Sequence, residues 1–178
     1  MRMNGYQIRE ALRRWGLKRD TAASQFDASL KRFDDETDKP APTTVMNAFT
    51  LADTKLAVLQ VAQDRYNLTV SVDVRFIDGI TRRVSLAEAV KLVGGAGRAE
   101  KMWRSAANPK KERYSYSTDD EVRKEGETRA KPVLTVAQCL AEAEKVARYA
   151  SNLRAAIAMG NGTEVDITID GLEPSDLV

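Results

Sequence analysis

Residues 67–90 read NLTVSVDVRFIDGITRRVSLAEAV, and the pattern of this stretch decides the fold. From Val70 to Phe76 apolar and polar residues alternate, which is typical of a strand with one buried face. Asp78-Gly79 is a common hairpin turn, after which the chain returns as a partner strand. Ser85-Leu86-Ala87-Glu88 then fits a capping box, in which the serine and glutamate side chains satisfy free backbone N–H groups at a helix start. The predicted elements are a β-hairpin over 68–84 and a helix over 86–107.

Two long helices are predicted before this hairpin. Apolar residues recur at steps of three and four from Ile8 to Phe33, and again from Val45 to Tyr66. Asn4 can cap the first helix, and Thr43 or Thr44 can cap the second. Because both stripes have a near-heptad period and a short polar linker joins them, we expect a long antiparallel helical hairpin over 4–66, packed like a coiled coil. The apolar face of the second helix is wide enough to need a further neighbour, which is another helix or another subunit.

Three elements follow the helix over 86–107. Residues 108–134 are charged and weakly patterned, so we expect a loop, and a second capping box at Thr135 opens a helix over 136–159. Alternating residues over 163–170 predict a C-terminal strand that pairs with the β-hairpin. The predicted fold class is therefore α+β and mainly helical, in a single domain over 1–178. It contains the long antiparallel helical hairpin, two further helices and a small three-stranded antiparallel sheet.

The composition excludes several classes of chemistry. The 178 residues contain no histidine and one cysteine, Cys139, so catalytic triads with histidine, His-ligated zinc and internal disulfides are excluded. Pairs of acidic residues such as Asp34-Asp35 and Asp119-Asp120 are more typical of solvated loops than of an acid–base site. We therefore expect a non-enzymatic protein without metal or cofactor, and we keep a carboxylate-based enzyme as a second alternative.

The chain shows no signal for a membrane. It has no run of about 18 apolar residues, and arginines interrupt the apolar residues near the start, where a cleavable signal peptide needs a continuous apolar stretch. We expect a cytoplasmic protein with no membrane partner. The formal net charge is only +2. This argues against a nucleic-acid partner, since domains that bind nucleic acid are strongly basic.

The strongest candidate for a ligand site is a glycine-rich and basic segment. Glycines leave backbone exposed to a ligand, arginine and lysine bind phosphate or carboxylate, and tyrosine rings stack on planar groups. These residue types favour a small anionic ligand such as a nucleotide. The glycines fit no phosphate-binding motif, and close packing of a neighbouring helix against them is the interpretation that we favour. The candidate residues are Gly94, Gly95, Arg98, Lys101, Arg104, Lys110, Lys111, Arg113, Tyr114 and Tyr116.

Several short motifs stand in the same order as in a known family. A long N-terminal helical hairpin is followed by Arg65-Tyr66-Asn67-Leu68-Thr69, by Ser85-Leu86-Ala87-Glu88-Ala89 and by Arg113-Tyr114-Ser115, with a final helix that ends near Asn161. This order resembles the septicolysin-like family of bacterial and phage proteins. The resemblance covers most of the chain and implies the helical hairpin. It supplies no catalytic residue, and the glycine-rich helix is a departure from the family.

The sequence favours a protein that acts by binding. The wide apolar helix faces predict a homo-oligomer assembled through the helical hairpin. The alternative is a protein that binds or sequesters the small anionic ligand described above.

Overall fold

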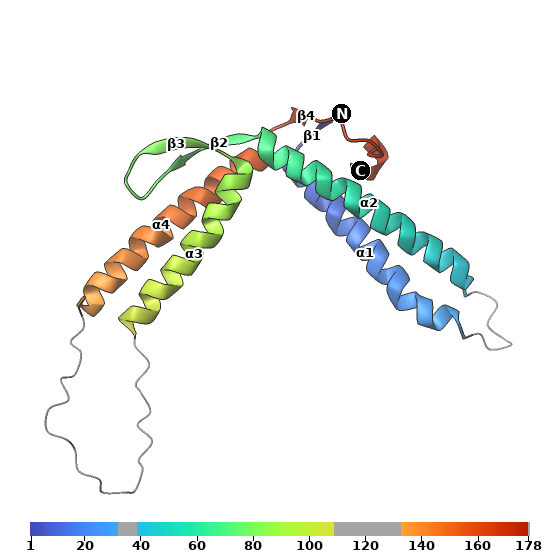
Figure 1. The fold of residues 1–178 in the computed structure, drawn as a ribbon, viewed down its shortest axis with the longest axis horizontal. Coiled ribbons are helices and arrows are strands. Elements are labelled where there is room, and N and C mark those ends of the chain that lie inside the picture. Colours follow the sequence, from blue (N-terminus) through green and yellow to red (C-terminus); the bar gives the residue numbers. More distant parts are fainter. Residues whose placement is uncertain (32–38, 109–132, 178) are drawn as a thin grey trace, which may run out of the picture.

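The computed structural model describes residues 1–31, 39–108 and 133–177. Its long helices form two antiparallel pairs, α1 with α2 and α3 with α4. Figure 1 shows the two pairs as arms that diverge from a common junction, with β1 and β4 at the junction and the β2–β3 hairpin extending from it over α4. The expectation of a mainly helical α+β fold with a long helical hairpin is confirmed. In chain order the elements are β1 (Arg2–Met3), α1 (Gly5–Ser29), α2 (Pro42–Thr69), β2 (Ser71–Arg75), β3 (Thr81–Ser85), α3 (Leu86–Ala107), α4 (Val136–Asn161), β4 (Val165–Asp166) and α5 (Pro174–Leu177).

The prediction of one three-stranded sheet is wrong. The β2–β3 hairpin forms as expected, with Val72 opposite Val84, but the C-terminal strand does not join it. β4 pairs instead with β1 at the start of the chain, in a second sheet of two strands. The ammonium group of Met1 extends this pairing by donating a hydrogen bond to the carbonyl of Ile167. The β-hairpin packs its apolar face against α4, so its face is already covered within the chain.

The core of the protein lies at the junction of the two arms. The largest fully buried side chains come from every long element that meets there, and they include Ile8 of α1, Leu59 and Tyr66 of α2, Leu86 of α3 and Leu153 of α4. Because apolar burial is the main source of folding free energy, the junction stabilises the fold more than the thin arms do. Each arm away from the junction is only two helices thick.

The helix starts follow the predicted capping with two corrections. Asn4 forms a complete capping box with Gln7, and Thr135 forms one with Gln138. Neither Thr43 nor Thr44 caps α2. That helix begins after Ala41, which makes no side-chain cap bond, and Pro42 occupies the first turn, where its missing N–H costs nothing.

The second correction concerns α3. Ser85 accepts a hydrogen bond from the backbone N–H of Glu88 as predicted, but the Glu88 side chain does not return to the cap. Glu88 instead lines the groove that is described in the next subsection.

Candidate functional site

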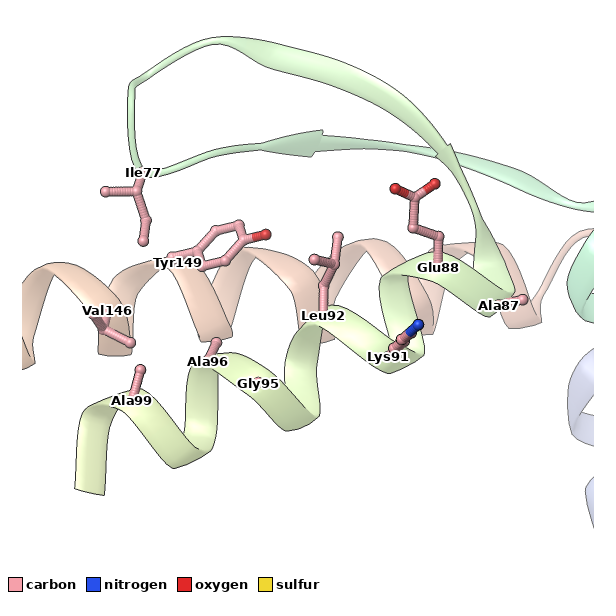
Figure 2. A pocket seen from close by; sticks show the side chains of 10 residues that line it. All are labelled: Ile77, Ala87, Glu88, Lys91, Leu92, Gly95, Ala96, Ala99, Val146 and Tyr149. Atoms are coloured by element: carbon pink, nitrogen blue, oxygen red, sulfur yellow. The ribbon is translucent and has the colours of Figure 1, made fainter. Parts of the chain in front are cut away.

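A groove of about 800 Å³ lies beneath the β2–β3 hairpin, between its tip and the pair α3–α4. Figure 2 shows Ile77 of the hairpin above the groove, Leu92 and Ala96 of α3 on the other side, and Tyr149 of α4 between them. Apolar side chains line most of the surface. Glu88 and Lys91 of α3 add the charged groups of the lining.

The hairpin is held over the groove by contacts at its tip. The ring of Phe76 packs against the ring of Tyr149, with 5.5 Å between ring centroids. The guanidinium carbon of Arg82 lies over the Phe76 ring, 4.7 Å from its centroid. Arg82 also forms an ion pair with Asp78. Gly79 adopts a φ of +82°, which an L side chain rarely adopts, so the turn needs glycine at this position. The tip is therefore a defined structure, and the space beneath it is fixed by side-chain contacts.

Tyr149 is the main polar group inside the groove. The residue as a whole is 8% exposed. In the part of the chain that the structure describes, no residue makes a hydrogen bond to its hydroxyl. Burial raises the pKa of Tyr149, and the nearby carboxylates of Glu88 and Asp78 act in the same direction, against Arg82. The hydroxyl therefore stays protonated at neutral pH and can donate a hydrogen bond.

Of the candidate residues predicted from the sequence, Gly95 lines this groove. Gly94, Arg98, Lys101 and Arg104 also lie on α3, where their residues are exposed. Arg104 forms an ion pair with Glu100, at 2.9 Å. The remaining candidates lie outside the described residues; they are Lys110, Lys111, Arg113, Tyr114 and Tyr116. The same holds for the acidic pairs Asp34-Asp35 and Asp119-Asp120.

The glycines of α3 lie in the middle of a continuous helix. Their N–H groups are therefore used in helical hydrogen bonds, and an anion at this place would have to be held by side chains. A Cβ atom added at Gly94, Gly95 or Gly97 would meet no described atom within 4 Å. Helix packing within this chain does not explain these glycines, although we favoured that interpretation from the sequence.

A second apolar surface lies on the outer part of the α1–α2 arm. Two hollows flank the line where the helices meet, and both are lined by Ala22 and Val45. The smaller hollow, about 220 Å³, also contains Phe26 and Phe49. The larger, about 460 Å³, is lined further by the residues Trp15, Leu17, Lys18, Thr21, Gln25, Ala48 and Leu51. We call these two hollows together the arm surface.

Side chains of the arm surface are unusually exposed for their type. Leu17 is 63% exposed and Leu51 is 53% exposed. The apolar face of a helix is normally covered by a neighbour, and here the two helices cover only the line between them. The wide apolar stripe of residues 45–66 predicts a further neighbour, and that expectation stays a prediction.

The described residues contain no group of three or more potential metal ligands among histidine, cysteine, aspartate and glutamate. Within the same residues, every helix is too short or too polar to cross a bilayer. Cys139 is a buried free thiol. Comparisons of the chain with protein-family models, with curated proteins and with solved structures find no match. The septicolysin-like resemblance therefore stays a prediction.

Proposed function

We propose that this is a non-enzymatic binding protein that associates with itself through the arm surface. The observation that carries the proposal is the exposure of large apolar side chains on both sides of a two-helix arm. Contiguous exposed apolar surface is typical of interaction sites, because leaving it in water is unfavourable.

The two sides of the arm surface together have nearly the size of a stable interface. The α1 residues of the hollows run from Trp15 to Phe26, a length of about 18 Å at about 1.5 Å per residue, and two helices side by side are about 20 Å wide. Each side therefore measures roughly 360 Å², and both together approach the roughly 800 Å² that each partner buries in a typical specific interface. Two such arms packed face to face would form a four-helix bundle, in which each pair covers the open side of the other.

A second copy of the chain is the partner that we favour. It supplies a hairpin of the same length and the same apolar face, and a closed two-fold arrangement buries both copies at once. Lys18 is the charged residue among those that line the two hollows, and its ammonium lies over the ring of Trp15, 4.0 Å from the centroid. Association driven by such a surface depends on apolar burial, so it should persist at high salt concentration.

Light scattering coupled to size-exclusion chromatography tests the proposal. We expect the wild type to be an oligomer at micromolar concentration and at both low and high salt. Leu51→Glu places a charge in the larger hollow and should shift the protein to the monomer. Met102→Glu is the matched control, because Met102 is 68% exposed and lies on the other arm. A strictly monomeric wild type, or equal effects of the two variants, would contradict the proposal.

A further inference from the structure

We propose that the groove beneath the β2–β3 hairpin binds a flat, uncharged aromatic molecule that carries a hydrogen-bond acceptor. This site is separate from the arm surface, because its residues come from the hairpin and the α3–α4 arm. Three independent observations define the class of ligand: the hydroxyl of Tyr149, the bare backbone at Gly95 and the balance of charge at the rim.

The size and lining of the groove suit a small molecule. Its volume of about 800 Å³ lies within the range of roughly 300–1,000 Å³ that is usual for ligand pockets. Ile77, Leu92, Val146 and three alanines of α3 present apolar surface to this space. The ring of Tyr149 belongs to the lining and packs against Phe76 from outside it, and aromatic rings stack well on such a ring.

The Tyr149 hydroxyl is the reason to expect a hydrogen-bond acceptor on the ligand. The hydroxyl oxygen is not among the buried unpaired atoms of the described residues, so water reaches it in the groove, and an acceptor atom of a ligand can replace that water. Figure 2 shows the hydroxyl directed along the groove, toward the end where Leu92 and Glu88 lie. None of the described residues serves as its partner, so a ligand atom can accept its proton.

The absence of a side chain at Gly95 favours a flat ligand. Glycine inside a helix costs about 1 kcal/mol relative to alanine, and no described atom occupies the space where a Cβ would lie. A side chain at this position would project into the groove, which Gly95 lines. Without one, a planar ring can lie directly on the helix backbone.

The charges at the groove favour an uncharged ligand. Glu88 and Lys91 are three residues apart on α3, so they lie on neighbouring turns of one helix face. At the hairpin, Arg82 and Asp78 form an ion pair with each other. Glu88 and Lys91 are the charged residues of the lining, so its formal charge sums to zero and offers no excess charge to attract an anion or a cation.

Two probes of the same shape test the proposal: 2-acetylnaphthalene, which has a carbonyl acceptor, and 2-ethylnaphthalene, which has none. Equilibrium dialysis of the full chain with ultraviolet absorbance measures the affinity for each probe. We expect the wild type to bind the acetyl compound more tightly. Tyr149→Phe should weaken this binding about fivefold, which is the effect of losing one hydrogen bond, and should leave the ethyl compound unchanged.

Gly95→Leu locates the probe. A leucine here fills the groove, and we expect both probes to bind roughly tenfold more weakly or not at all. Gly94→Leu is the matched control, because it adds the same side chain to the neighbouring position of α3, which does not line the groove. Circular dichroism and thermal unfolding show whether each variant is folded.

The proposal is overturned if the wild type binds neither probe, or if Gly95→Leu and Gly94→Leu have equal effects. It is also overturned if Gly95→Leu changes the oligomeric state in light scattering while Gly94→Leu does not, since the groove would then be an interface between copies. These outcomes are distinct from a failure of the arm surface, which Leu51→Glu tests separately.

Discussion

The hydroxyl of Tyr66, near the end of α2, lies 2.6 Å from the carbonyl oxygen of Gly160, near the end of α4. It lies 2.7 Å from the carbonyl oxygen of Thr163 as well. Tyr66 is completely buried, and burial raises the pKa of its hydroxyl, so the group remains a hydrogen-bond donor at neutral pH. This contact joins the two arms between residues that are 94 positions apart in the sequence.

Tyr66→Phe should therefore destabilise the whole fold. The substitution removes the hydroxyl and leaves the ring, so the lost hydrogen bond accounts for the expected cost of about 1–2 kcal/mol in the free energy of unfolding. Urea denaturation measures this value. Tyr6→Phe is the control at the same junction: the Tyr6 hydroxyl donates to the Ala158 carbonyl, but the residue is half exposed and should change stability by less than about 0.5 kcal/mol. Equal effects would show that Tyr66 does not join the arms.

Glycine-to-alanine substitutions at Gly160 and Gly94 should change the stability of the protein in opposite directions. A Cβ at Gly160 would lie 2.6 Å from Val72 Cγ1 and 3.0 Å from Leu86 Cδ1, so Gly160→Ala should destabilise the protein by about 1–3 kcal/mol. At Gly94 the added methyl group meets no described atom, and Gly94→Ala should stabilise α3 by about 0.5–1 kcal/mol through helix propensity. Thermal unfolding distinguishes the two signs. A lower melting temperature for both variants would indicate that a partner or ligand occupies the space at Gly94.

The sequence predicts those features that depend on residues close together in the chain. The Asn4 and Thr135 caps form with residues three positions ahead, and the Asp78-Gly79 turn joins adjacent strands. Such contacts need no knowledge of the rest of the fold, because the groups are brought together by local geometry.

Features that depend on distant contacts are not predicted. The pairing of β4 with β1 requires the end of α4 to lie beside the start of α1, and the Tyr66 contact fixes that arrangement. The buried face of α4 is also set by distant contacts: Leu140 is exposed, whereas Tyr149 is buried beneath the hairpin. Alanines lie on several sides of this helix, so apolar periodicity alone does not select one face.

The candidate groove likewise combines a residue that the sequence singles out with one that only distant contacts bring there. Gly95 is noticeable in the sequence because glycine is unfavourable inside a helix, whereas nothing local connects it with Tyr149, 54 positions later. The hairpin brings these residues to one groove. Of the residues that the sequence singled out, Gly95 alone is among the groove-lining residues of the described chain, and only the fold brings the Tyr149 hydroxyl into the same groove.

The two capping boxes predicted from the sequence should respond differently to substitution. Gln138→Ala removes the side chain that accepts a hydrogen bond from the Thr135 backbone N–H at 2.8 Å, and should cost about 0.5–1 kcal/mol. Glu88→Ala removes no such bond, because the Glu88 carboxylate does not return to the Ser85 backbone, and should change stability by less than about 0.5 kcal/mol. Urea denaturation compares them. A larger loss of stability for Glu88→Ala would mean that the Ser85–Glu88 capping box closes in solution.

A buried ion pair attaches the C-terminal helix to the α1–α2 arm. Lys55 Nζ lies 2.8 Å from the Asp176 carboxylate, which also accepts a hydrogen bond from the backbone N–H of Glu173. Burial raises the pKa of Asp176, but these hydrogen bonds outweigh burial and hold the pKa below its ordinary value of 3.8. Because the folded protein binds this proton less readily than the unfolded chain, the carboxylate stabilises the fold above about pH 4, and the stabilisation is lost as pH falls through the folded pKa.

Asp176→Asn tests this linkage. At pH 7 the variant should be less stable than the wild type by about 1–3 kcal/mol, because the Lys55 ammonium then faces a neutral group in a buried place. The difference between the two proteins should shrink as the pH falls below about 4, because Asp176 is then protonated in the unfolded chain, and it should vanish only below the folded pKa. Urea denaturation at intervals from pH 7 to pH 3 measures the difference, with the exposed Asp170→Asn as the control. A difference that stays constant over this range would mean that the Asp176 charge does not stabilise the fold, and that the variant acts only through altered packing.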